Sequence, residues 1–151
     1  MRAGLLLPAF LAVLAPSIAG ALPFPARLGD YSVGAGPALV AGEGGVGGGV
    51  AAEANLLLGL FSLGAHGRGV AGGGGSAAGV EVAFAGLIGV GMGVQEAGAS
   101  IDGLLAVPLP FGGDPWFLSL GWRPSFLVAG GVRHEISLQI KWSSLLVAGD
   151  D

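Results

Sequence analysis

Polar and apolar residues alternate along residues 131–142 (GVRHEISLQIKW), the most strongly patterned stretch of the chain. The polar positions are Arg133, Glu135, Ser137, Gln139 and Lys141. The positions between them are apolar, apart from His134. Residues two apart lie on the same face of a β-strand, so this spacing predicts a strand with one polar face and one apolar face.

The same alternation recurs in seven earlier segments, which are separated by breaks rich in glycine or proline. The pattern predicts eight strands, over residues 31–41, 47–58, 60–70, 78–87, 89–96, 99–109, 115–127 and 131–142. These lengths suit tilted strands that cross a membrane, which need about 9–11 residues. Apart from Glu96 at a segment end, the charged residues of these segments fall on the polar faces: Glu53, Arg68, Glu81, Asp102, Arg123, Arg133, Glu135 and Lys141.

A sheet with an apolar outer face must close on itself in lipid, because lipid cannot satisfy the hydrogen-bonding groups of an open edge. The sequence therefore predicts an all-β fold, an eight-stranded antiparallel up-and-down transmembrane β-barrel over residues 31–142. With eight strands, both ends of the barrel chain lie at one rim. Tyr31, Trp116 and Trp142 would then meet there, and we predict that they form an aromatic girdle at the lipid boundary.

The predicted interior holds four acidic and four basic side chains. An eight-stranded barrel is only wide enough inside for side chains, and an unpaired charge there would be costly. We therefore expect a lumen ion-pair network of Glu53, Glu81, Asp102 and Glu135 with Arg68, Arg123, Arg133 and Lys141, which fills the lumen and blocks conduction. A path for protons or ions is the alternative use of these residues.

The composition fits a chain that meets lipid. Of 151 residues, 52% are hydrophobic, 11% are charged and 32 residues are glycine. The chain has no cysteine, which excludes disulfides and thiolate metal sites, and its net charge of -4 without a basic cluster argues against nucleic-acid binding. A rival interpretation is an exported glycine-rich helical membrane protein, in which residues 77–94 form a helix that packs through its small residues.

The N-terminus has the pattern of a secretory signal peptide. Arg2 precedes an apolar run from Leu5 to Leu14, and the small residues Ala19-Gly20-Ala21 follow as a cleavage site. We expect a signal peptide over residues 1–21 that is cleaved after Ala21. An irregular lead-in over residues 22–30 would precede the barrel, and residues 143–151 would form a C-terminal extension.

The cleaved signal, the short glycine-rich alternating strands and the aromatic end of the last strand resemble the small outer-membrane β-barrel proteins of Gram-negative bacteria, the OmpA/OmpX-like class. The resemblance covers residues 31–142. It implies an outer-membrane monomer in contact with outer-membrane lipids and the assembly machinery, with a structural or surface-interaction role. A narrow channel or a transport component is the alternative. Chains of this class usually end on the aromatic residue, whereas SSLLVAGDD follows Trp142 here.

Three patterns that might indicate chemistry fail on geometry. Ser62 and His66 share a face with Asp102 available, but residues four apart on a strand are separated by roughly 13 Å, too far for a catalytic hydrogen bond. His134, Glu135 and Ser137 resemble the active strand of barrel-borne lipid deacylases, yet Ser137 points to the face opposite His134.

The G-x-G runs in residues 34–45 and 89–98 lack the strand-turn-helix context of a dinucleotide site. We expect that the protein is not an enzyme, and a barrel-borne lipid hydrolase is the alternative. We also expect that it binds no cofactor and no metal.

Overall fold

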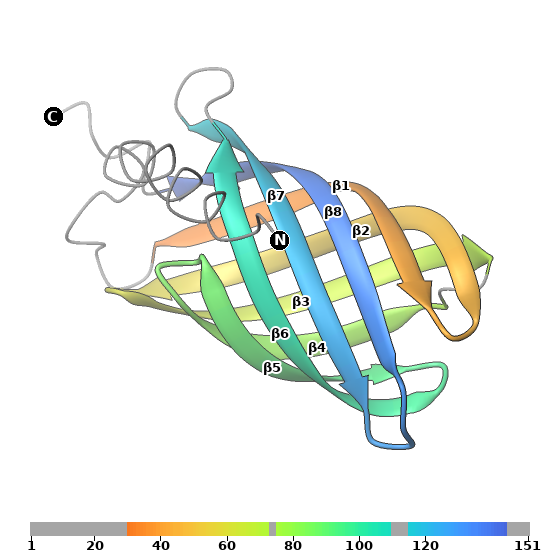
Figure 1. Cartoon of the computed structure of the whole chain (residues 1–151). Coiled ribbons are helices and arrows are strands. Elements are labelled where there is room, and N and C mark those ends of the chain that lie inside the picture. Colours follow the sequence, from red (N-terminus) through yellow and green to blue (C-terminus); the bar gives the residue numbers. More distant parts are fainter. Residues whose placement is uncertain (1–29, 73–74, 110–114, 145–151) are drawn as a thin grey trace, which may run out of the picture.

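Eight antiparallel strands form one closed barrel (Figure 1). The computed structural model describes residues 30–72, 75–109 and 115–144. The strands are β1 (Tyr31–Gly42), β2 (Gly45–Leu58), β3 (Phe61–Gly72), β4 (Ala77–Phe84), β5 (Ile88–Gln95), β6 (Gly98–Leu109), β7 (Trp116–Leu127) and β8 (Val132–Ser143). Each strand pairs with its neighbours in the chain, so the predicted all-β, up-and-down barrel is confirmed.

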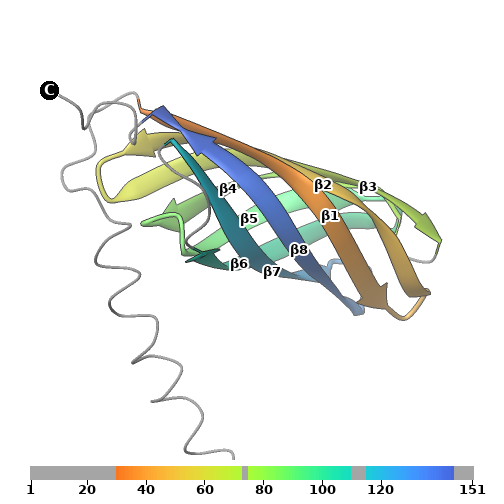
Figure 2. The same cartoon turned by 90° about the horizontal axis from the view of Figure 1, so that it is seen from above.

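Pairing between β1 and β8 closes the sheet. The two strands lie side by side in Figure 2. Val33 lies opposite Trp142, and Ala41 lies opposite His134. We call the end where β1 begins and β8 ends the terminal rim, and the other end the distal rim. Beyond the ladder, Ser144 Oγ accepts a hydrogen bond from the Tyr31 backbone N–H (2.9 Å) and donates one to Asp30 (3.1 Å). These contacts join the two ends of the described barrel at the terminal rim.

Side chains alternate between the inside and the outside of the barrel along every strand, as the pleat of a strand requires. In β8 the inward positions 135, 137, 139 and 141 are buried, whereas the outward positions 134, 136, 138 and 140 are exposed. The charged residues of the strands lie inside, together with a few small or apolar residues such as Val40 and Leu104, and the exposed large residues outside are apolar apart from His134. This distribution is the reverse of that in a water-soluble domain.

One strand boundary differs from its prediction by more than two residues. The segment expected as a single strand over residues 78–87 ends at Phe84, because a tight turn follows it. Ala85 and Gly86 have positive φ angles of 52° and 67°, and Leu87 N–H donates to the Phe84 carbonyl at 3.0 Å. Two consecutive residues with positive φ suit the twist of a hairpin. Alanine rarely adopts this conformation, so the Ala-Gly pair did not stand out as a turn.

The helical alternative is wrong, because residues 77–94 form strand β4, a turn and most of strand β5. Among the residues that the structure describes, no helix is long and apolar enough to cross a membrane. The predicted signal peptide over residues 1–21, most of the lead-in over residues 22–30 and all but the start of the C-terminal extension lie outside the described residues.

Candidate functional site

All the charged side chains of the strands point into the barrel. Seven of them are buried, and Arg133 near the distal rim is partly exposed. The set comprises Glu53, Arg68, Glu81, Asp102, Arg123, Arg133, Glu135 and Lys141. These are the residues that the strand periodicity assigned to the lumen, and the barrel brings them together from β2, β3, β4, β6, β7 and β8.

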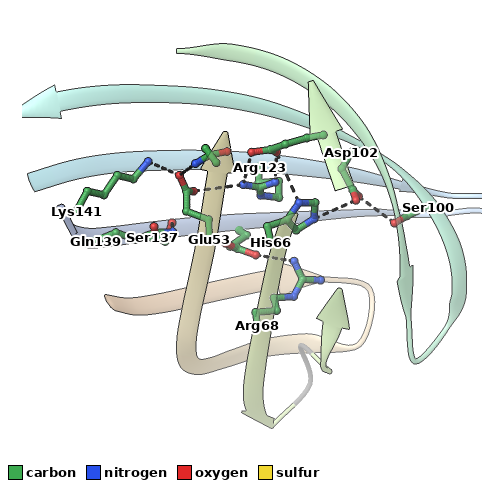
Figure 3. A network of polar contacts seen from close by, with 12 residues as sticks. Glu53, His66, Arg68, Ser100, Asp102, Arg123, Ser137, Gln139 and Lys141 are labelled. Carbon is green, nitrogen blue, oxygen red and sulfur yellow. Dashed lines mark hydrogen bonds and ion pairs between the residues drawn. The ribbon is translucent and has the colours of Figure 1, made fainter. Parts of the chain in front are cut away.

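One group of charges lies in the middle of the lumen, and we call it the central cluster (Figure 3). It consists of Glu53, His66, Glu81, Asp102, Arg123 and Lys141. Lys141 Nζ donates a hydrogen bond to Glu53 Oε1, and Arg123 Nη1 donates to Glu81 Oε2. Arg123 Nη2 also lies 3.7 Å from Glu53 Oε2, so the guanidinium links two carboxylates that come from different strands.

A second group, the distal cluster, lies nearer the distal rim and consists of Arg68, Gln95, Arg133 and Glu135. Arg68 Nη1 donates to Glu135 Oε2 at 2.8 Å, and its Nη2 donates to the Gln95 amide oxygen at 2.8 Å. The same oxygen accepts a hydrogen bond from Arg133 at 3.2 Å. The neutral amide of Gln95 thus joins two cationic side chains that would otherwise repel each other.

His66 is a member of the central cluster that the predicted network omitted. Its Nδ1 lies 3.6 Å from Glu81 Oε2 and its Nε2 lies 3.4 Å from Asp102 Oδ2. Asp102 also accepts a hydrogen bond from Ser100 Oγ at 2.9 Å. The phase of His66, two residues before Arg68 on the same strand, was the available signal that it faces the lumen.

Glycines on β4 and β5 make room for this histidine and its partners. The inward face of β5 is Gly89, Gly91 and Gly93, with Gln95 at its end. A Cβ atom at Gly79 would lie 2.8 Å from the His66 ring, and one at Gly93 would lie 2.6 Å from Asp102 Oδ2. Any larger residue at these two positions would push the imidazole or the carboxylate out of place.

A small cavity lies beside the central cluster, toward the terminal rim. Its volume of about 10 Å³ is close to the least that holds one water molecule. The lining residues are Glu53, Leu104, Ala106, Ser119, Gly121, Arg123, Ser137, Gln139 and Lys141. The amide oxygen of Gln139 is buried and has no hydrogen-bond partner within the protein. A bound water is the ordinary way to satisfy such an acceptor.

Apolar side chains cover the outward face of every strand. Met92 and Val94 of β5 are each 67% exposed, and most of the outward isoleucines, leucines and phenylalanines of the other strands are exposed as well. No Asp, Glu, Lys or Arg of the eight strands points outward. The result is an apolar belt around the barrel, of a kind that soluble monomers rarely expose.

The three aromatic residues predicted for the girdle lie at the terminal rim. The rings of Tyr31 and Trp142 have centroids 5.2 Å apart, and Trp116 is the cross-strand partner of Trp142. Tyr31 and Trp116 are exposed on the outward face. Aromatic rings of this kind are enriched where a lipid bilayer meets water.

His134 is the one histidine on the outward face of the described strands. Its ring stacks on Trp122, with centroids 5.9 Å apart and an interplanar angle of 18°. Ser137 is buried inside the barrel, so the wall separates it from His134. The structure therefore does not assemble the serine–histidine pair of the lipid-deacylase pattern.

The structure also shows where the G-x-G runs and the possible metal ligands lie. The G-x-G runs lie within β1 and β5, where glycines face the lumen, and neither opens a helix. Over the part of the chain that the structure describes, no three His, Cys, Asp or Glu side chains are grouped closely enough to hold a metal ion. Comparisons with protein-family models, with curated proteins and with solved structures find no match.

Proposed function

We propose that this protein is an outer-membrane β-barrel whose side-chain-filled lumen does not conduct, and that its role is structural or in surface interactions. The observation that carries the proposal is the reversed distribution of polarity. Every Asp, Glu, Lys and Arg of the strands is inside, and the outward face of the eight strands is apolar apart from His134 of β8. In water, such an exterior would drive aggregation, whereas in a bilayer it is the matching surface.

Closure of the sheet supports a position within lipid. The pairing of β1 with β8 leaves no open edge along the sheet's length, so the backbone groups at membrane depth are satisfied by neighbouring strands. Barrels of this kind are typical of the outer membrane of Gram-negative bacteria, and the signal-like N-terminus fits export to that compartment. The partners are then the outer-membrane lipids and the assembly machinery, and the barrel functions as a monomer.

The central and distal clusters support a blocked lumen. Arg68, Glu81 and Arg123 are each less than a tenth exposed, and their ion pairs cross from one wall of the barrel to another. The cavity beside them has a volume of about 10 Å³, which leaves room for one water molecule at most. Mutually paired charges of this kind fill space inside the barrel and hold its walls together.

Reconstitution tests this proposal in two steps. The mature chain is refolded into phosphatidylethanolamine–phosphatidylglycerol vesicles, and gel migration is compared before and after boiling. A shift in migration together with a strand-rich circular dichroism spectrum is expected. Failure to insert, with the folded chain remaining in the aqueous fraction, would contradict the membrane location.

Conductance across planar bilayers tests the blocked lumen and separates the alternative. We expect no steady current from the wild-type barrel. The double variant Glu81→Ala/Arg123→Ala removes the main pair of the central cluster and is expected to conduct. The outward double variant Val82→Ala/Trp122→Ala is the matched control and stays closed. Steady current from the wild type would favour the narrow channel, for which the polar cavity near Lys141 is the supporting observation.

A further inference from the structure

His134 is the polar exception on the apolar outward face of the barrel. It is exposed on β8, two residues from the start of that strand at the distal rim. Its cross-strand partners are Ala41 of β1 and Pro124 of β7, and neither has a side chain that can hydrogen-bond to an imidazole. Within residues 30–72, 75–109 and 115–144, no group of the protein hydrogen-bonds to the His134 ring.

The indole of Trp122 holds this imidazole in place. The two rings are stacked with their planes 18° apart and their centroids 5.9 Å apart. Trp122 is the cross-strand partner of Ile136, so the indole lies nearer the middle of β8 than the imidazole does. Stacking covers a face of the imidazole and leaves its edge, which carries both nitrogen atoms, clear of the indole. A ring that is already held in one orientation loses little freedom when a ligand binds to that edge.

The depth of His134 follows from the spacing of residues along β8. Leu138 lies near the middle of the strand, His134 is four residues before it and Trp142 is four residues after it. Four residues span about 13 Å along a strand, or about 10 Å along the membrane normal at a tilt of 35–45°. The apolar band of such a barrel is about 25 Å tall, so both rings lie about 2–3 Å inside its edges. His134 is therefore at the distal lipid boundary, as Trp142 is at the terminal one.

Lipid phosphate groups lie just beyond this boundary, and phosphate is a strong hydrogen-bond acceptor. A neutral imidazole always carries one N–H donor, so the contact does not depend on a charged ring. Left without an acceptor at the edge of the apolar band, that N–H would be a costly unpaired polar group. A hydrogen bond to an ionised acceptor is also stronger than one between neutral groups.

We propose that His134 and Trp122 form a binding site for the phosphate-bearing headgroup of a lipid in the leaflet at the distal rim. The imidazole N–H donates to a phosphate oxygen, and the indole packs against the adjoining apolar part of the same lipid. The site rests on the membrane location proposed above and names one lipid contact of that barrel.

Nitrogen–phosphorus distances from solid-state NMR test this proposal. The barrel, with isotope-labelled histidine nitrogens, is reconstituted into phosphatidylethanolamine–phosphatidylglycerol vesicles, and the dephasing of each imidazole signal by lipid phosphorus is recorded. A hydrogen bond to a phosphate oxygen places nitrogen and phosphorus about 4 Å apart, so strong dephasing is expected at His134. His66 inside the lumen is the internal reference and should show none. His134→Gln assigns the two rings.

Two variants test the contribution of the stacked indole. Trp122→Leu keeps the outward surface apolar but removes the stack, so the His134 signal should lose most of its dephasing. Trp116→Leu is the matched control, because it makes the same change near the other end of β7. It should leave the His134 signal at the wild-type level. Full dephasing in Trp122→Leu would show that the two rings do not form one site.

A wild-type His134 signal without dephasing would overturn the proposal. Equal dephasing in phosphate-free galactolipid vesicles with inorganic phosphate in the buffer would overturn it too, because the ligand would then be free phosphate. Insertion is scored first on the same sample by gel migration before and after boiling. An inserted barrel without dephasing rejects the lipid site alone, whereas failure to insert rejects the membrane location and the site with it.

Discussion

Arg68 shows how much a single lumen residue contributes to this fold. Its guanidinium is buried and donates to Glu135 and to Gln95. Replacing Arg68 by Met leaves the Glu135 carboxylate buried without its main partner, and loss of one member of a buried pair costs about 3–5 kcal/mol. We expect the free energy of unfolding to fall by about that much, as measured by urea titration of the detergent-folded barrel.

A substitution of Glu135, the partner of Arg68, provides the control. Adding Glu135→Leu to Arg68→Met removes the stranded charge, so most of the lost stability should return. Ile136→Ala, on the outward face of the same strand as Glu135, should cost less than Arg68→Met. Lipid or detergent fills the space that the smaller side chain leaves, and no buried charge loses its partner. A double variant as unstable as Arg68→Met alone would show that the pair does not act as a unit.

At the scale of the strand, β5 is specialised by the glycines at its inward positions 89, 91 and 93. A Cβ atom at Gly93 would lie 2.6 Å from Asp102 Oδ2 and 2.9 Å from the Ala78 carbonyl oxygen. Gly93→Ala must therefore shift both the backbone and the His66 partner, and overpacking of this kind costs about 1–3 kcal/mol. Gly48→Ala is the matched control, because its Cβ would meet no atom within 4 Å. Equal unfolding free energies for the two variants would contradict the close fit.

The strands were predictable from the sequence because the period of two is a local property. Seven of the eight predicted segments begin and end within about two residues of the observed strands, and the charged positions fall inside as the phase required. The turn at Ala85 was missed, since alanine gives no turn signal. The partners of His66 depend on the register between β3, β4, β5 and β6, which periodicity within one strand does not contain.

For the whole molecule, a substitution at Leu138 tests whether lipid or water surrounds the barrel. Leu138 lies near the middle of β8 on the outward face, opposite Leu120 of β7. In a bilayer, Leu138→Arg places a charge at the midplane and should cost about 2–4 kcal/mol, whereas Val128→Arg in the exposed turn between β7 and β8 should cost about 0–1 kcal/mol. Urea titration of the vesicle-folded variants measures both. Because an outward arginine is harmless on a water-facing barrel, a difference below about 1 kcal/mol would place this face in water and remove the basis for the membrane assignment.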